Sequence, residues 1–171
     1  MLTSSIEYFK DNQYKLPETV LAPIIIAWKL RTPENYGNLI RVADTIGAAN
    51  IFFVGNEESV ASRKIKRTAG KSYQSVSFCF VRPDELLEQI PSNYKVLALE
   101  TATGSTNLFQ TKLPKNMALV VGNEKAGIDK DFLSHCKKIV HIPLTGSCTS
   151  LNVSHAATIT LFEWLRQVLF I

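Results

Sequence analysis

The stretch that decides the fold lies in the C-terminal third, where residues 118–128 read ALVVGNEKAGI and residues 139–153 read IVHIPLTGSCTSLNV. Each part begins as a short β-type run and then changes into a polar, glycine-bearing loop. The small and polar residues of the two loops are Gly122, Asn123, Glu124, Gly127, Gly146, Ser147, Ser150 and Asn152. Buried strands that end in loops rich in backbone donors form small-molecule sites at the carboxyl edge of α/β sheets. The two loops therefore predict a ligand site at such an edge.

Upstream of this stretch, strand-like and helix-like patterns alternate. Residues 24–30 are a β-branched run of strand length, and residues 49–55 are a second one. Between them, residues 39–46 have apolar side chains at helical spacing, with Gly47 as the expected C-cap. Residues 32–38 contain proline, asparagine and glycine and are predicted to form a loop. A strand–helix–strand unit of this kind is typical of a parallel sheet.

The same alternation continues to the end of the chain. Further strands are predicted at residues 76–81, 95–100, 117–121 and 138–144. Further helices are predicted at residues 57–68, 83–90 and 150–169, with loops at 69–72 and 101–113 and a bridging segment at 129–136. Residues 1–22 are expected to form a short helix and a lead-in. About six strands alternating with helices predict one α/β domain over residues 1–171, with a mostly parallel sheet flanked by helices.

Composition and charge exclude several classes of protein. The apolar share is 46% and the charged share 20%, which are values of globular rather than disordered chains. The net charge of +4 is compatible with a polyanionic partner. The three cysteines are dispersed without a CxxC pair, so neither a disulfide framework nor a metal site is expected. The N-terminus lacks a signal-peptide pattern and no apolar run reaches membrane-spanning length, so we expect a cytoplasmic protein without membrane contact.

The common nucleotide and hydrolase motifs are missing. The sequence contains no GxxxxGK[ST] phosphate loop, no GxGxxG dinucleotide fingerprint and no GxSxG nucleophile elbow. Three other polar motifs do occur in a fixed order, each after a predicted strand: Asn35-x-Gly37-x-x-x-Arg41, Gly122-x-Glu124-x-x-Gly127 and Ser150-Leu-Asn152. Together they resemble the three motifs of the SpoU (TrmH-like) branch of the SPOUT RNA methyltransferases. The resemblance covers roughly residues 24–166.

The resemblance implies a fold and an activity that spacing alone does not. It implies a SPOUT fold in which residues 118–155 form a deep trefoil knot that holds S-adenosylmethionine. It also implies a homodimer that methylates ribose 2′-hydroxyls of RNA. Many relatives carry an additional N-terminal RNA-binding domain, for which residues 1–22 are too short. By analogy with small stand-alone members, tRNA is expected as the substrate.

The family motifs also imply the catalytic residues. Arg41 is expected to engage the 2′-hydroxyl or the adjacent phosphate and to stabilise the developing alkoxide. Asn35 would orient Arg41 or hold the knot loops, and Glu124 would position Arg41 or a ribose. Ser150 and Asn152 would order the last loop and the methionine end of the cofactor. The alternatives are structural: a solvated Arg41, turn residues at 35 and 37, a turn cap at Glu124 and a helix N-cap at Ser150.

Two further groups of residues are expected to bind ligands. The cofactor would be held by loop groups at Thr101, Gly122, Asn123, Gly127, Ile142 and Leu151. RNA would contact a basic cluster, which consists of Arg63, Lys64, Lys66, Arg67 and Lys71. The alternative for this cluster is an ordinary solvated face.

The last predicted helix carries more apolar residues than one stripe against its own core requires. They are Leu161, Trp164, Leu165, Val168, Leu169 and Phe170. This excess predicts that the homodimer is buried largely through the last helix.

Three alternatives to a tRNA methyltransferase stay open. The first is an enzyme of the same kind that acts on rRNA. The second is a SPOUT-fold protein without activity that binds RNA. The third is an unrelated α/β nucleotide-binding module, which would have no affinity for S-adenosylmethionine.

Overall fold

The computed structural model describes residues 4–56 and 62–171, and in this part of the chain seven strands form one sheet. The strands are β1 (Ile24–Trp28), β2 (Asn50–Val54), β3 (Phe78–Val81), β4 (Lys95–Leu99), β5 (Thr106–Asn107), β6 (Met117–Val121) and β7 (Lys138–His141). Their order is β3-β2-β1-β6-β4-β7-β5, and every neighbouring pair is parallel. The predicted α/β class with a parallel sheet is therefore confirmed.

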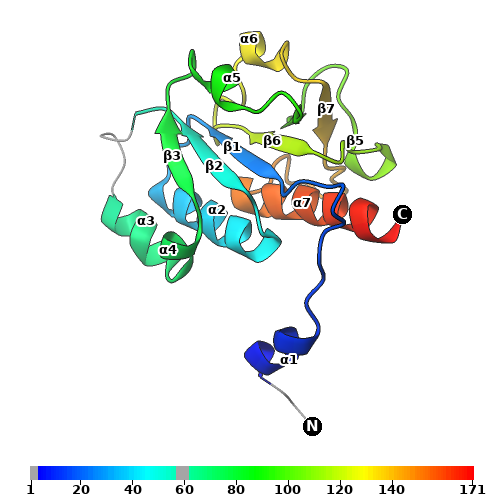
Figure 1. Cartoon of the computed structure of the whole chain (residues 1–171). Coiled ribbons are helices and arrows are strands. Elements are labelled where there is room, and N and C mark those ends of the chain that lie inside the picture. Colours follow the sequence, from blue (N-terminus) through cyan, green and yellow to red (C-terminus); the bar gives the residue numbers. More distant parts are fainter. Residues whose placement is uncertain (1–3, 57–61) are drawn as a thin grey trace.

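Helices cover both faces of the sheet (Figure 1). The helices of the described part are α1 (Ser5–Asp11), α2 (Pro33–Ile46), α3 (Ser62–Ala69), α4 (Ser72–Ser75), α5 (Leu86–Gln89), α6 (Lys130–Leu133) and α7 (Val153–Phe170), with a 3₁₀ turn, η2 (Leu108–Gln110). Figure 1 shows α2, α3, α4 and α7 on one face and α5 and α6 on the other. None of the described helices is long and apolar enough to cross a membrane.

The two central strands explain the position of the core. Every residue of β1 and β6 is buried, as expected for parallel strands covered on both faces. Successive side chains point to opposite faces, so Ile25 and Ala27 pack in the layer of α2 and α7. Ile24 and Ile26 pack in the layer that contains Leu86 of α5. The carboxyl ends of β1 and β6 are therefore held side by side.

The predicted loop at residues 32–38 is wrong, because α2 already begins at Pro33. Proline suits the first helical position, where its missing N–H has no intrahelical partner. Gly37 lies inside this helix because α3 crosses there. A Cβ on Gly37 would lie 2.5 Å from the Cβ of Thr68 and 2.8 Å from the carbonyl oxygen of Ile65. Gly37 is thus a close-packing residue rather than a turn residue, whereas the predicted cap at Gly47 is confirmed by its left-handed conformation, φ 68°.

Other boundaries differ from the sequence predictions. The predicted helix at 83–90 is reduced to α5, in which only Leu86 is buried, and the predicted strand at 76–81 begins at Phe78. The predicted loop at 101–113 contains β5 and η2. Of the predicted helix at 57–68, residues 57–61 lie outside the described residues, and the remainder is α3.

The predicted interface role of Trp164 and Leu161 is wrong, because both side chains are fully buried within the subunit. The indole Nε1 of Trp164 donates to the carbonyl oxygens of Pro114 (3.1 Å) and Lys115 (3.0 Å). Part of the apolar excess on α7 therefore packs against the segment that leads into β6, within the same subunit. Phe162 and Phe170 remain exposed, at 44% and 63%.

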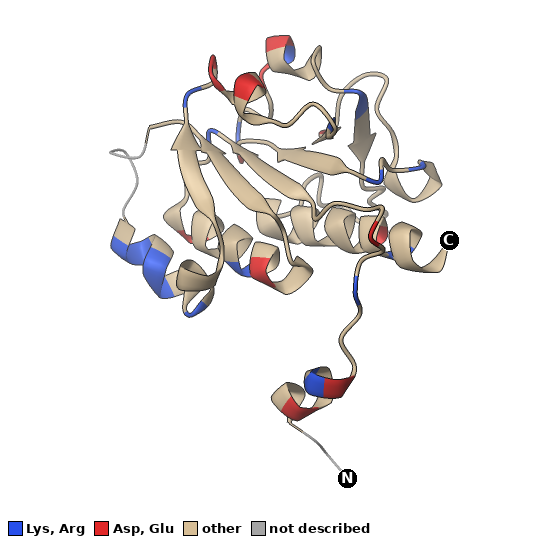
Figure 2. Cartoon of the chain, in the orientation of Figure 1, with Lys and Arg blue, Asp and Glu red and all other residues tan. Residues whose placement is uncertain are grey.

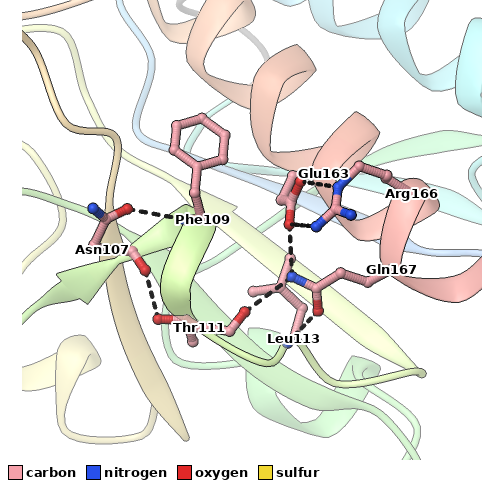
Figure 3. Close-up of polar contacts among 7 residues, drawn as sticks. All are labelled: Asn107, Phe109, Thr111, Leu113, Glu163, Arg166 and Gln167. Atoms are coloured by element: carbon pink, nitrogen blue, oxygen red, sulfur yellow. Dashed lines mark hydrogen bonds and ion pairs between the residues drawn. The ribbon is translucent and has the colours of Figure 1, made fainter. Parts of the chain in front are cut away.

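A polar network ties α7 to the same segment (Figure 3). Gln167 points from α7 toward residues 111–113. Its side chain donates to the carbonyl oxygen of Thr111 (3.0 Å) and accepts from the N–H of Leu113 (2.9 Å). The buried carboxylate of Glu163 accepts from Gln167 (2.8 Å) and, through both oxygens, from Arg166 (2.8 Å each). The guanidinium of Arg166 thereby holds the pKa of Glu163 below its usual value. We call this set the α7 clamp: Glu163, Arg166, Gln167, Thr111 and Leu113.

The strand order places the C-terminal strands inside the sheet. β6 lies between β1 and β4, whereas β7 lies on the other side of β4, so the chain crosses β4 between the two strands. Lys29 after β1 receives a hydrogen bond on its carbonyl oxygen from the side chain of Asn123, in the loop after β6. The C-terminal loops are thus joined to the N-terminal half. Threading of residues 118–155 into a knot stays a prediction.

The N-terminal segment extends away from the sheet (Figure 1). α1 starts with a capping box in which Ser4 and Glu7 bond reciprocally, and none of its residues is buried. Between this helix and β1, the ring of Tyr14 meets Phe170 edge-on at 5.7 Å between centroids. The predicted helix and lead-in at residues 1–22 are confirmed within the described part.

Candidate functional site

A cavity of about 740 Å³ opens at the carboxyl ends of β4, β6 and β7, beside the N-terminus of α2. All predicted catalytic and cofactor residues except Arg41 line it. They are Asn35, Thr101, Gly122, Asn123, Glu124, Gly127, Ile142, Ser150, Leu151 and Asn152. The structure thus brings the three sequence motifs to one place. The volume is in the range that holds a small organic ligand.

Glu124 joins the loop after β6 to the start of α2. Its carboxylate accepts from the backbone N–H groups of Arg31 and Thr32 (3.1 Å each) and from the Asn35 side chain (2.8 Å). Thr32, the N-cap of α2, makes no side-chain cap of its own, and Glu124 holds the backbone just before the helix rather than the N–H groups of its first turn. Burial raises the pKa of this carboxyl, but hydrogen bonds from its own backbone, Asn35, Arg31 and Thr32 outweigh burial and lower it overall. Glu124 is therefore an anchored carboxylate rather than a partner of Arg41.

Asn35 connects this carboxylate to the last motif. Its side-chain oxygen accepts from the side-chain amide of Asn152 (3.0 Å), and its own amide donates to Glu124. The Asn152 oxygen accepts from the backbone and the hydroxyl of Ser154 (2.9 and 2.7 Å) and so caps α7. Of the two roles expected for Asn35, these contacts fit the one of holding the loops together and not that of orienting Arg41. The alternative of Ser150 as the helix N-cap is wrong, because Asn152 is the N-cap. Ser150 is exposed in the cavity wall.

The loop after β6 folds back on itself because of its glycines. Asn123 and Gly127 exchange backbone hydrogen bonds (3.1 and 3.0 Å), and the Asn123 side-chain oxygen accepts from the N–H groups of Lys125 and Ala126 (2.9 and 3.0 Å). A Cβ on Gly122 would lie 2.8 Å from the carbonyl carbon of Gly127. A side chain at position 122 would therefore disrupt the loop itself. Its effect on a ligand would be indirect, through the altered loop.

Arg41 does not line the large cavity. It lies eight residues after Pro33, about 12 Å along the helix, because α2 starts earlier than predicted. It is exposed and borders a smaller cavity of about 280 Å³ with residues of α7, among them His155 and Phe162. Asn38 lines both cavities, so they adjoin. The helix predicted at residues 39–46 would have Arg41 in its first turn, beside the ligand site, and this placement is wrong for a single subunit.

The basic cluster lies together on α3 and the start of α4 (Figure 2). All five side chains, Arg63, Lys64, Lys66, Arg67 and Lys71, are exposed, whereas Ile65 and Ala69 of α3 are buried. Lys64 reaches Glu34 at 3.6 Å, and Glu34 lines the large cavity. Lys66 lies over the ring of Tyr73 at 5.9 Å. The basic face is therefore next to the mouth of the cavity.

Glu100 and His141 are among the polar residues of the cavity wall that were not predicted as site residues. Glu100 follows β4 directly, and His141 ends β7, where Ser105 lies within hydrogen-bonding distance of its Nδ1 (2.9 Å). The signal that could have found them is their place at the carboxyl ends of predicted strands. Within residues 4–56 and 62–171, no group of three or more histidine, cysteine or acidic residues lies together as a metal site would require.

Comparison with known proteins identifies the family. The sequence model of the SpoU rRNA methylase family matches residues 22–162. The mouse (Mus musculus) tRNA (guanosine(18)-2′-O)-methyltransferase TARBP1 is 30% identical over 98% of this chain and 11% of the mouse protein. The 23S rRNA (guanosine-2′-O-)-methyltransferase RlmB of Blochmanniella floridana is 30% identical over 90% of this chain and 61% of that protein.

A solved methyltransferase structure has a similar fold. The AdoMet-bound rRNA methyltransferase of Sinorhizobium meliloti is 28% identical, with a TM-score of 0.79, over 88% of this chain and 58% of that one. The chain thus spans less than two thirds of the length of each of these relatives. Because the family model covers most of the sequence and the fold agrees, this chain belongs to the SpoU rRNA methylase family.

Proposed function

We propose that the protein is an S-adenosylmethionine-dependent RNA methyltransferase that modifies a ribose 2′-hydroxyl, with tRNA as its substrate. The observation that carries this proposal is the single cavity at the carboxyl edge of the sheet, whose wall contains residues of all three family motifs. The relatives named as tRNA and rRNA 2′-O-methyltransferases support the reaction type.

The residues present fit the cofactor. Its site would be the wall formed by Thr101, Gly122, Asn123, Gly127, Ile142 and Leu151, in the segment for which we also propose the trefoil knot, residues 118–155. The tight Asn123–Gly127 turn leaves no room for a Cβ at Gly122, and this shapes a backbone cradle of the kind that nucleoside ligands use. The Sinorhizobium relative, which shares the fold, binds AdoMet. When bound, the cofactor supplies an activated methyl group on a sulfonium.

The protein has to make a weakly acidic hydroxyl reactive. A guanidinium can stabilise the developing alkoxide and the adjacent phosphate in one plane, and this is the role that we propose for Arg41. Within the part of the chain that the structure describes, the guanidinium of Arg41 forms no hydrogen bond or ion pair that would hold it elsewhere. Glu124, Asn35 and Asn152 keep the loops of the cavity in register through their hydrogen-bond chain.

We further propose a homodimer in which the face of α2 and α7 meets a second copy. The face exposes Phe162, and the small cavity beside it contains Arg41 and His155. Because Arg41 does not line the large cavity of its own subunit, a second copy on this face is the arrangement that lets an Arg41 act on a cofactor site. The catalytic unit would then contain residues of both subunits.

The RNA would lie across α3 toward the cavity. The basic cluster supplies phosphate contacts, and the ion pair of Lys64 with Glu34 shows how near it is to the cavity wall. We favour tRNA because the mouse relative, which matches 98% of this chain, is named as a tRNA methyltransferase. The second candidate is rRNA, which the relatives of the 23S rRNA class favour.

The test is direct methylation. The protein is incubated with methyl-labelled cofactor and, separately, with unmodified tRNA and rRNA transcripts, and the labelled RNA is hydrolysed with alkali. A 2′-O-methyl group prevents cleavage at its own nucleotide, so the label should remain in an alkali-resistant dinucleotide of tRNA. Label released as a base-methylated mononucleotide would contradict ribose methylation, and label in rRNA alone would overturn the tRNA assignment.

A further inference from the structure

Glu100 occupies a central place in the cavity wall. Its backbone N–H donates to the carbonyl oxygen of Val140 in β7 (2.9 Å), which ties the end of β4 to β7. Its carboxylate accepts from the N–H of Thr101 and from the N–H of Ile128 (2.9 Å each). One residue therefore connects the loop after β4, the loop after β6 and strand β7.

Gly127 makes room for this carboxylate. A Cβ on Gly127 would collide with the Glu100 carboxylate, whose carbon would be 3.0 Å away. The residue also has φ +67°, which side chains rarely adopt, so the backbone favours glycine here, and any side chain would in addition displace the Glu100 carboxylate. The loop of the second motif is thus shaped around a carboxylate that belongs to none of the three motifs.

The carboxylate has acceptor capacity left. Each carboxylate oxygen can accept two hydrogen bonds, and among the described residues each oxygen of Glu100 accepts one, from a backbone N–H. No lysine or arginine of the described part forms an ion pair with it. Because Glu100 lines the cavity, the remaining acceptor sites suit a ligand that brings hydroxyl donors.

Chemistry identifies those donors. In dinucleotide-binding α/β folds, an acidic residue binds a ribose hydroxyl, because a carboxylate accepts hydrogen bonds from hydroxyl groups. A phosphate group of a ligand would not bind there, because it is itself an anion. Resting on the proposed function, we propose that Glu100 accepts a hydrogen bond from a ribose hydroxyl of the S-adenosyl cofactor. Glu100 thereby selects ribonucleoside over deoxyribonucleoside ligands.

The test compares ligands as well as variants. Dissociation constants are measured by calorimetry for S-adenosylhomocysteine and for its 2′-deoxy and 3′-deoxy analogues. The proteins are the wild type, Glu100→Ala, Glu100→Gln and, as control, Asp129→Asn. Asp129 is an exposed carboxylate near the same loop that pairs with Lys29 and does not line the cavity. Thermal unfolding of each variant shows whether it is folded at the temperature of the measurement.

We expect the wild type and Asp129→Asn to prefer the hydroxylated ligand over one deoxy analogue by about 10- to 100-fold, the range for a hydrogen bond to a charged group. In Glu100→Ala this preference should fall below about threefold. Glu100→Gln keeps the shape of the side chain with a neutral acceptor, so its preference should lie between the two, which tests the proposal even where the alanine variant does not fold.

The contrary outcomes are distinct from one another. If Glu100→Ala weakens all three ligands by the same factor, Glu100 only joins loops and the proposal is wrong. If the wild type does not discriminate the analogues, the hydroxyls are not recognised at all and the proposal is equally wrong. If the wild type binds no S-adenosylhomocysteine, the proposed function itself fails.

Discussion

The side-chain amide of Asn152 donates to the side-chain oxygen of Asn35 at 3.0 Å, across 117 positions of sequence. Through Glu124, this contact connects the first, second and third family motifs in one chain of hydrogen bonds. Motifs that are far apart in the sequence therefore act as one structural unit around the cavity.

Removing Asn35, the middle member of this chain of hydrogen bonds, should lower both the stability of the protein and its affinity for the ligand. Asn35 is only 4% exposed, so Asn35→Ala removes a buried amide and its hydrogen bonds to Glu124 and Asn152, and it should lower the free energy of unfolding by about 1–3 kcal/mol. Denaturant unfolding measures this loss, and calorimetry should show weaker cofactor binding. Asn38→Ala, one turn along the same helix, is the control and should leave stability nearly unchanged. Equal stability of both variants would show that the chain of hydrogen bonds does not support the fold.

Glu124 should give stability a defined dependence on pH. Its folded pKa lies below the ordinary value of 4.5, so its stabilising contribution is present above pH 4.5 and is lost as the pH falls through the folded pKa. Glu124→Gln removes that contribution at neutral pH but not in acid. Denaturant unfolding should therefore separate the two proteins at pH 7, and the difference should shrink as the pH falls below 4.5. A difference that grows on acidification would contradict this sign.

Arg41→Ala should remove methyl transfer and leave cofactor binding near normal. Loss of one preorganised charge in the transition state typically lowers the rate about 100- to 1,000-fold. Lysine should not restore activity, because an ammonium lacks the planar fork of the guanidinium. Single-turnover rates at saturating RNA measure the chemical step. An undiminished rate would make Arg41 a surface residue only.

Mixed dimers show whether Arg41 acts between subunits. Arg41→Ala subunits keep the cofactor site, and Gly122→Val subunits keep Arg41 but have a distorted loop. If the arginine acts across the dimer, co-refolding the two inactive variants should restore activity in the mixed species. If each subunit uses its own Arg41, the mixture stays inactive.

The proposed interface predicts opposite results at two neighbouring aromatic residues. Phe162→Glu places a charge on the exposed face of α7, so sedimentation should show a folded monomer at micromolar concentration. Trp164→Glu buries a charge in the subunit core and should unfold the protein instead, because Trp164 is fully enclosed. A Phe162→Glu protein that remains dimeric would move the interface elsewhere.

The basic cluster should control RNA affinity rather than chemistry. Changing Arg63, Lys64, Lys66 and Arg67 to glutamine should raise the dissociation constant for RNA and flatten its dependence on salt by up to one unit of slope per lost phosphate contact. Single-turnover rates at saturating RNA should stay near the wild-type value. A fall in those rates with unchanged affinity would assign the cluster to the active site itself.

Much of the cavity was predictable from sequence because strand ends are local features. The apolar runs at residues 24–30 and 117–121 predict buried parallel strands, and the polar residues that follow them must meet at one edge. The position of Arg41 was not predictable in this way. It depends on where α2 begins, and proline, asparagine and glycine at residues 33–37 favour a loop in isolation.

Tertiary contacts decide the remaining cases. Gly37 is explained only by the approach of α3, which no local pattern announces. Likewise, an apolar excess on a helix does not reveal which surface covers it, and Trp164 finds the carbonyl groups of Pro114 and Lys115 in its own chain. In the sequence, Glu100 is only the residue that ends a predicted strand. Its contact with the loop at Gly127 becomes visible only in the structure.

The hydrogen bond between Asn152 and Asn35 also has a consequence for biosynthesis. The first and second motifs are translated before the third. The nascent chain therefore contains Asn35 and Glu124 while one wall of the cavity is still missing. The α7 clamp, which holds residues 111–113, is translated later still. A partly synthesised chain that lacks the third motif therefore cannot close the wall of the cavity.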